Sequence, residues 1–250
     1  VDGREVWRCV EDWALAATWD GPPLTCLVAS GDGLMVGTAE AHVLRLSDPT
    51  LVLDESFDRL PERASWYTPW GGPPDTRSMA ADADSVLVNI HVGGVARRDR
   101  SGPWRSLVDI DVDVHQIAVA PDGSLLAATG AAGFGRSTDA GATWEWDSDG
   151  LHGSYCRAVT VAGDEVLLTA STGPRGTQGA VYRRQLGRQG GWERISDLVK
   201  GNIDTFWLAA SGETAAYVTQ DGQLWASDDA GSTWDHVSDL TAAPRALALV

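Results

Sequence analysis

Cysteine is rare in this sequence, and the cysteines are far apart. Cys9, Cys26 and Cys156 are the three in 250 residues, and none forms a CxxC pair. This argues against a disulfide framework or a structural zinc site and favours a reduced setting. The sequence also lacks a signal peptide and a long apolar run. We therefore expect a cytoplasmic protein without a membrane span, although a trimmed leader before Val1 stays open.

Positive charge is also scarce. Nineteen Lys and Arg residues stand against 35 Asp and Glu residues, so the formal net charge is −16, and Lys200 is the one lysine. Nucleic acids and anionic membranes need clustered basic residues. We therefore expect neither as a partner. Nearly all cations are arginines, whose planar guanidinium groups suit carboxylates and phosphates.

The sequence lacks the 3.6-residue periodicity of long amphipathic helices. It contains instead 28 Gly, 11 Pro and 12 Trp residues, a composition typical of an all-β protein with many turns. A chain of this length buries about three-quarters of its unfolded surface, so a core forms without disulfides. We expect one domain over residues 1–250 and a monomer.

Two segments repeat each other without gaps. Residues 137–144 and 227–234 both read S-x-D-x-G-x-T-W. Ser and Asp side chains hydrogen-bond backbone N–H groups inside tight turns, and Gly permits a positive φ. The Trp then fills the space between neighbouring sheets. We predict purely structural roles for Ser137, Asp139, Gly141, Trp144, Ser227, Asp229, Gly231 and Trp234.

With these two motifs the chain resembles the BNR/Asp-box β-propellers, a superfamily that includes sialidases, sortilin-type receptors and photosystem assembly factors. The resemblance implies four-stranded antiparallel blades around a central channel. Sialidases hold their substrate carboxylate with three arginines and use a Tyr–Glu pair and an Asp acid. Arg77, Arg157 and Tyr155 match parts of this set, but a third arginine and the Glu are missing. The resemblance therefore carries over structural roles and no catalytic one.

The spacing of four tryptophans agrees with a propeller. Trp104, Trp144, Trp192 and Trp234 are 40, 48 and 42 residues apart, which is the length of a four-stranded blade. Alternating apolar runs follow each of them. The pattern predicts blades over residues 24–58, 76–109, 114–149, 155–197 and 203–239. Residues 5–20 and 244–250 would pair as a sixth blade that closes the ring, with five or seven blades as alternatives.

In such a propeller the turns before each innermost strand share one face, and the Asp boxes lie on the other. Two long loops, residues 59–75 and 172–179, are attached to the first face and suit a grafted function. The same face receives Asp75, Asp113, Arg175 and Asn202, whereas His236 falls on an outer strand. We predict a ligand site there formed by Arg77, His91, His115, His152, Tyr155, Arg157 and Asp204.

Each of these residues also has a structural interpretation. Arg77, His115, Arg157 and Asp204 begin innermost strands, where they could simply pair with one another. His91, His115 and His152 could bind a metal together, but they come from separate loops and lack the short sequence spacing typical of metal ligands. Asp109, Asp111 and Asp113 alternate as in a calcium loop, yet Val114 stands where Gly is needed. Cys156 is better explained as a buried strand residue than as a nucleophile. We predict no metal and no cofactor.

Two functional hypotheses remain. The first is a non-catalytic scaffold that holds a small polar or anionic ligand, or a protein segment, at the channel mouth. The alternative is a glycosidase-like hydrolase or lyase. His115, His152 or Tyr155 would then be the acid or base, and Arg77 and Arg157 would clamp the anion.

Overall fold

The computed structural model describes residues 3–100, 102–108, 110–242 and 244–249. They form five sheets, whose strand pairs are antiparallel except for one bridge in the first sheet. The described helices are one short α-helix, α1 (Glu55–Asp58), and two 3-10 helices, Pro61–Ser65 and Ile110–Val112. No described helix is long and apolar enough to cross a membrane. The chain divides into two compact units, Val1–Val114 and His115–Val250, which are described separately.

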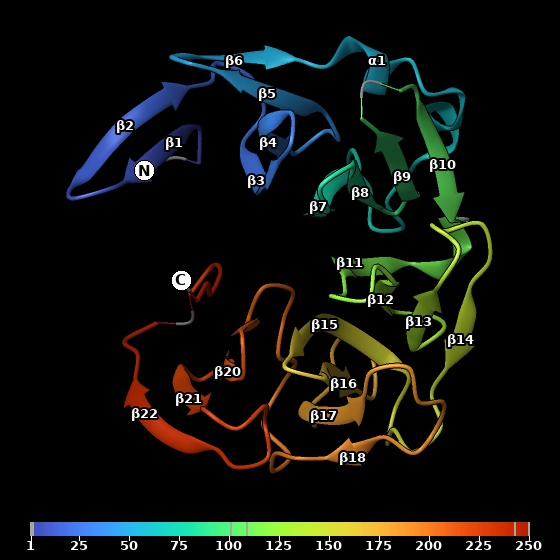
Figure 1. Cartoon of the computed structure of the whole chain (residues 1–250), viewed down its shortest axis with the longest axis vertical. Helices are drawn as coiled ribbons and strands as arrows, with labels where there is room; N and C mark the ends of the chain where they lie inside the picture. Colours follow the sequence, from blue (N-terminus) through green and yellow to red (C-terminus); the bar gives the residue numbers. More distant parts are fainter. Residues whose placement is uncertain (1–2, 101, 109, 243, 250) are drawn as a thin grey trace. The chain divides into compact units, whose positions relative to one another are not determined.

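Unit 1 holds the first two sheets (Figure 1). The first has the strand order β1-β2-β6-β5-β4-β3, in which one parallel bridge, Thr18 to Thr50, joins β2 to β6. The second has the order β10-β9-β8-β7. The strands are β1 (Glu5–Cys9), β2 (Trp13–Thr18), β3 (Leu24–Ser30), β4 (Gly33–Thr38), β5 (Val43–Ser47), β6 (Thr50–Leu53), β7 (Asp75–Ala81), β8 (Ser85–His91), β9 (Gly94–Asp99) and β10 (Trp104–Val108).

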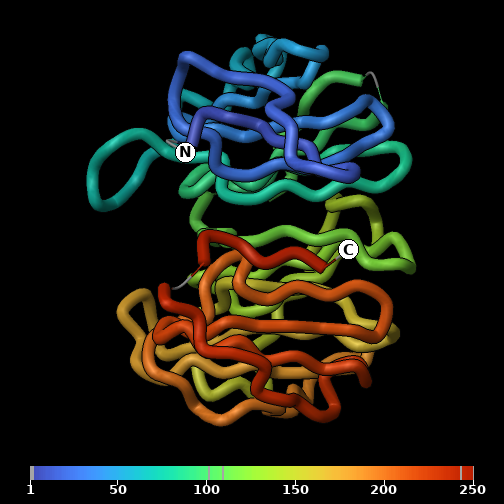
Figure 2. The backbone as a smooth tube through the Cα atoms, turned by 90° about the vertical axis from the view of Figure 1, so that its left-hand side faces the viewer, coloured from blue at the N-terminus to red at the C-terminus, as the bar shows by residue number. Residues whose placement is uncertain are grey.

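Unit 2 holds three four-stranded sheets, which lie side by side in Figures 1 and 2. Their strands follow one another in chain order, as hairpin connections require. They are β11 (Val114–Val119), β12 (Leu125–Thr129), β13 (Phe134–Ser137), β14 (Glu145–Asp147), β15 (Tyr155–Ala162), β16 (Glu165–Ser171), β17 (Ala180–Gln185), β18 (Glu193–Arg194), β19 (Leu208–Ser211), β20 (Thr214–Val218), β21 (Gln223–Ser227) and β22 (Asp235–Asp239).

Four four-stranded sheets, and strands β3 to β6 of the first sheet, confirm the predicted four-stranded blades, but the prediction of six blades was wrong. Residues 5–18 form a hairpin that joins the first sheet, where Val6 and Ala17 pack with Val36 and Leu44. The described residues 244–249 contain no strand. Period-2 alternation had identified the strands of the hairpin correctly but could not show which sheet they join.

The two Asp boxes make the same hydrogen bonds. The Ser137 hydroxyl accepts a bond from the Gly141 N–H at 2.9 Å, and Asp139 accepts from the Thr143 N–H at 2.8 Å. Ser227 and Asp229 repeat these contacts at the same two distances with Gly231 and Thr233. Gly141 and Gly231 have φ values of 88° and 81°, the region that favours glycine. Each box thus closes the turn between the third and fourth strands of its blade.

The second and fourth sheets lack a box and use an arginine instead. Arg98 on β9 pairs with Asp54, and its guanidinium carbon lies 4.9 Å from the centre of the Trp104 ring. Arg184 on β17 pairs with Asp147, and its guanidinium carbon lies 4.2 Å from the centre of the Trp192 ring. Both carboxylates come from the preceding sheet. Each arginine therefore ties its sheet to the one before it.

Candidate functional site

Four of the predicted site residues meet in unit 2. His115 lies on β11, Tyr155 and Arg157 lie two residues apart on β15, and Asp204 precedes β19. Residues i and i+2 of a strand share one face, so Tyr155 and Arg157 point the same way. We call His115, Tyr155, Arg157 and Asp204 the tyrosine cluster.

A chain of contacts connects the tyrosine cluster. Nδ1 of His115 lies 2.6 Å from the Cys156 carbonyl oxygen, so Nδ1 carries a proton, and Nε2 is the acceptor of the neutral imidazole. The Tyr155 hydroxyl lies 3.4 Å from this Nε2 and accepts a bond from Arg157 at 3.3 Å. Arg157 also donates to Asp204 at 2.6 Å. The hydroxyl of Tyr155 is thus held between a base and a cation.

A cavity of about 420 Å³ adjoins the cluster, and we call it the cationic pocket. Its lining includes Arg157, Arg175, Lys200, Asn202, Asp204 and Trp207. The described lining residues carry three cations and one carboxylate. The predicted functional loop 172–179 forms one wall. The Asn202 amide holds this loop by donating to the Gly173 and Pro174 carbonyl oxygens at 3.3 and 3.1 Å.

His152, also predicted for the site, lies against β17. Its Nδ1 is 2.7 Å from the Tyr182 hydroxyl, and its Nε2 is 2.7 Å from the Gln178 carbonyl oxygen. Both ring nitrogens are therefore occupied, which leaves the imidazole poorly placed for proton transfer to a substrate. The structure gives His152 a positioning contact with loop 172–179.

Arg77 and His91, the predicted site residues of unit 1, lie on β7 and β8. At the end of β8, Nδ1 of His91 lies 3.6 Å from Asp75, and Nε2 lies 3.3 Å from Asp113. Burial opposes protonation of His91, but the hydrogen bonds of Asp113 and Asp75 outweigh it and raise the pKa of the imidazole. Arg77 on β7 acts against this shift. These contacts favour a protonated His91 between two carboxylates.

Long loop 59–75 carries two tryptophans with different surroundings. Trp66 is buried, with its ring centre 5.7 Å from that of Phe57, so it belongs to the core of unit 1. Trp70 is 66% exposed, and its ring centre lies 4.9 Å from that of His91. Trp70 therefore covers the His91 group and leaves much of its own surface open.

The structural interpretation of Cys156 agrees with its surroundings. The side chain is fully buried, and burial raises the pKa of the thiol well above its usual range. A buried neutral thiol is a poor nucleophile. Of the residues considered for calcium, Asp109 lies outside the described residues, and Asp113 faces His91.

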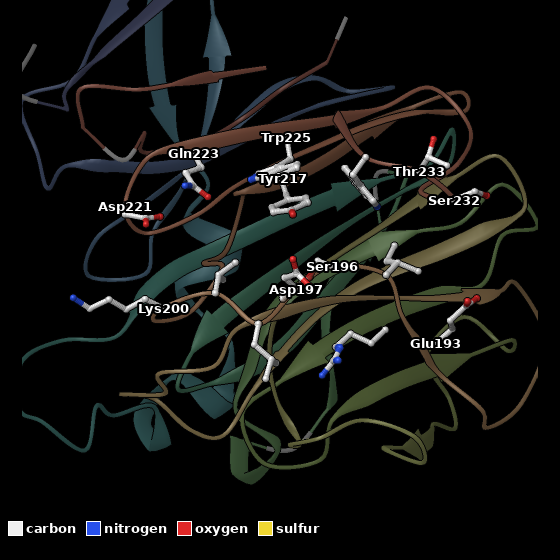
Figure 3. A pocket seen from close by; sticks show the side chains of 15 residues that line it. Glu193, Ser196, Asp197, Lys200, Tyr217, Asp221, Gln223, Trp225, Ser232 and Thr233 are labelled. Atoms are coloured by element: carbon white, nitrogen blue, oxygen red, sulfur yellow. Dashed lines mark hydrogen bonds between the residues drawn. The ribbon is translucent and has the colours of Figure 1, made fainter. Parts of the chain in front are cut away.

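A larger cavity of about 720 Å³ in unit 2, which we call the blade groove, was not predicted from the sequence. One wall is the segment Glu193–Lys200, and the other comes from β20, β21 and the second Asp box. Figure 3 shows Tyr217 and Trp225 facing Ser196 and Asp197. These walls come from two different blades, so no single sequence motif predicts the groove. The tryptophans of the repeat were the available signal for the groove in the sequence, but their pattern predicted residues packed between neighbouring sheets.

No protein-family model matches the sequence, and no curated protein matches it significantly. Solved structures with little sequence identity share its fold. Virginiamycin B lyase from Staphylococcus aureus superposes with a TM-score of 0.66 at 13% identity, over 94% of this chain and 77% of the lyase. YCF48 bound to D1 peptide gives 0.58 at 17% identity, over 90% and 72%. The computationally designed protein Ika8 gives 0.62 at 12% identity, over 91% and 66%.

These likenesses show the fold alone. The chain spans about two thirds to three quarters of the length of these neighbours. Together with the five sheets, four of them four-stranded and the first extended to six strands by the hairpin of β1 and β2, they establish that the chain is a β-propeller.

Proposed function

We propose that this propeller is a non-catalytic binding protein of the BNR/Asp-box type, whose cationic pocket holds an acidic segment of another protein. The observation that carries the proposal is the meeting of Arg157, Arg175 and Lys200 around one cavity. The whole chain has only 19 cations and a net charge of −16. Three cations against one carboxylate make this pocket a local exception that suits an anionic ligand.

The side chains are arranged for carboxylates. Asp204 holds the Arg157 guanidinium in one orientation, and only 16% of the Arg157 side chain is exposed. A fixed fork loses little freedom when it binds a carboxylate. Arg175, in loop 172–179, and Lys200, in the segment before Asn202, are exposed. Both side chains can therefore contact a bound segment. Trp207 adds an apolar surface to the pocket.

The neighbour structures are compatible with this function. YCF48 was solved with a bound D1 peptide, so a related blade arrangement does hold a polypeptide segment. The two boxes with matching hydrogen bonds support the assignment to the Asp-box type.

The test is a fluorescence anisotropy titration with two synthetic probes. Fluorescein-Gly-Gly-Asp-Glu-Asp-amide carries the acids, and fluorescein-Gly-Gly-Asn-Gln-Asn-amide is its neutral counterpart. We expect the acidic probe to bind and the neutral probe to bind at least about tenfold more weakly, since charge-assisted hydrogen bonds are lost.

Arg175→Ala and Lys200→Ala should each weaken binding of the acidic probe about fivefold, which is the effect of losing one contact between charges. Arg188→Ala, which removes an exposed arginine outside the pocket, is the control and should leave binding unchanged. Equal binding of both probes, or no effect of the two pocket variants, would overturn the proposal.

The geometry of the tyrosine cluster favours a second candidate, a lyase or hydrolase on a carboxylated substrate. Here Nε2 of His115 receives the Tyr155 hydroxyl proton, and Arg157 stabilises the phenolate. In the lyase reaction the phenolate removes the proton next to the substrate carboxylate, a C=C bond forms as the C–O bond to the leaving group breaks, and the leaving oxygen takes the proton from His115. A panel of uronic-acid polysaccharides and glycosides tests this candidate. If a substrate is turned over and Tyr155→Phe abolishes the turnover, the protein is an enzyme and the non-catalytic proposal is wrong. Binding without turnover would support the non-catalytic proposal.

A further inference from the structure

We infer that the polypeptide held in the cationic pocket continues past Lys200 into the blade groove, which takes an extended stretch with alternating apolar side chains. This inference rests on the proposed function and adds the shape and sequence of the partner. The pocket and the groove both lie in unit 2.

The pocket and the groove meet at one end. Lys200 lines both cavities, and the neighbouring residues Gln220 and Asp221 line the pocket and the groove respectively. Figure 3 shows Lys200 and Asp221 at one end of the groove and Thr233 of the second Asp box at the other. A chain that leaves the cationic pocket at Lys200 therefore enters the groove directly.

The aromatic wall of the groove is already formed. The Tyr217 ring is stacked with Trp225 at 6.3 Å and meets Trp234 edge-on at 4.8 Å. Tyr217 is 3% exposed, whereas Trp225 and Trp234 are only half-buried. Rigid, partly exposed tryptophans give large apolar contact at small entropic cost. They suit apolar side chains of a bound segment.

The opposite wall is also fixed. Backbone hydrogen bonds hold this wall to β17 and to the residue just before it. The Ile195 N–H donates to the Val181 carbonyl oxygen at 3.0 Å, and Val199 and Gly179 exchange two bonds at 2.8 and 3.0 Å. Between these anchors Leu198 is 44% exposed. A groove with two anchored walls needs little rearrangement on binding.

The wall formed by β21 suits an extended peptide. Gln223 and Trp225, two residues apart on this strand of five residues, both line the groove. An extended chain rises about 3.4 Å per residue, so about five ligand residues fit alongside this strand. Because successive side chains of an extended chain point in opposite directions, every second one would face the tryptophans. Ser196 and Gln223 on the walls offer hydrogen bonds to the remaining polar groups.

The charges that line the two cavities indicate which part of the bound segment lies in the pocket and which part lies in the groove. The groove is lined by Asp197 and Asp221 beside Arg194 and Lys200, and Glu193 is already paired with Arg183 at 3.0 Å. These charges balance in the groove, whereas the cationic pocket has three cations against one carboxylate, so the acids of the partner belong in the cationic pocket. The inferred ligand is thus an acidic cluster followed, in either chain direction, by about five residues of alternating apolar character.

The experiment compares the short acidic probe with two longer ones. Each longer probe joins Asp-Glu-Asp through Gly to Leu-Ser-Phe-Ser-Leu, with the acids at the N-terminus in one and at the C-terminus in the other. We expect one of them to bind at least about tenfold tighter than the short probe, because two or three apolar side chains become buried.

Leu198→Asp places a charge in the groove and should remove that gain while leaving the short probe unchanged. Leu198→Ser is a second variant, and Val237→Asp, at a 56% exposed position of β22 outside the groove, is the control. A short probe that fails to bind would overturn the proposed function. A short probe that binds while neither long probe gains affinity would overturn only this inference. Binding of chitohexaose that depends on Leu198, without a gain for the long probes, would assign the groove to saccharides and also overturn it.

Discussion

Nη1 of Arg157 lies 2.6 Å from Oδ1 of Asp204, so the most enclosed cation of the cationic pocket already has a carboxylate partner. Asp204 fixes the guanidinium and at the same time competes with an anionic ligand for it. Its other bond, accepted from the Thr205 N–H at 2.8 Å, can be kept by an amide oxygen.

Asp204→Asn should therefore strengthen binding of the acidic probe about three- to tenfold, because it removes the one carboxylate of the pocket without removing the bond to Thr205. Anisotropy titration measures the change. Asp164→Asn, in the exposed turn between β15 and β16, is the matched control for net charge. Weaker binding by Asp204→Asn would mean that orienting Arg157 matters more than the charge.

The Asp boxes predict how stability depends on pH. The bonds donated by the Thr143 side chain and backbone lower the pKa of Asp139 to about 2, and those of Thr233 lower that of Asp229 to about 2. An aspartate has a pKa near 3.9 in an unfolded chain. The folded state binds the proton more weakly, so the boxes stabilise the fold above about pH 4 and lose this contribution as the pH falls towards 2.

We expect the melting temperature of the wild-type protein to fall more steeply between pH 4 and pH 2 than that of an Asp139→Asn/Asp229→Asn variant. Circular dichroism melts across this range measure both slopes. The variant should be the less stable protein at pH 7, and the two should converge near pH 2. Parallel curves over the whole range would show that the boxes do not contribute through their ionised form.

Arg184 and Arg183 are neighbours on β17 with opposite surroundings. Arg184 is buried between Trp192 and Phe134 and pairs with Asp147, whereas Arg183 pairs with the exposed Glu193. Arg184→Met should cost about 2–4 kcal/mol of unfolding free energy, because it leaves the Asp147 carboxylate without its cation. Arg183→Met should cost less than about 1 kcal/mol. Urea denaturation measures both values, and similar losses would contradict the role given to Arg184.

The sequence predicted the blades well because their signals are local. Two boxes and four periodic tryptophans set the repeat, and strand alternation between turns set the bounds. The hairpin of residues 5–18 was misplaced because it joins the first sheet through one described bridge, from Thr18 to Thr50, and through packing on Val36 and Leu44. Neither of these long-range contacts leaves a pattern in the sequence.

The site was predicted in part for a related reason. Tyr155 and Arg157 share a strand face, so their neighbourhood follows from alternation. The engagement of His152 with Tyr182, and the pairing of Arg184 with Asp147, depend on contacts between segments 30 and 37 residues apart. The blade groove needs the packing of one blade against the next, which no motif encodes.

The most direct test of the account is a reversal of charge in the cationic pocket. Arg175→Glu/Lys200→Glu changes the local charge by four units while altering only exposed side chains. The wild-type protein should prefer fluorescein-Gly-Gly-Asp-Glu-Asp-amide over fluorescein-Gly-Gly-Lys-Arg-Lys-amide, and the double variant should show the opposite preference. An unchanged preference in a variant with the wild-type melting temperature would contradict the claim that this pocket recognises acidic segments.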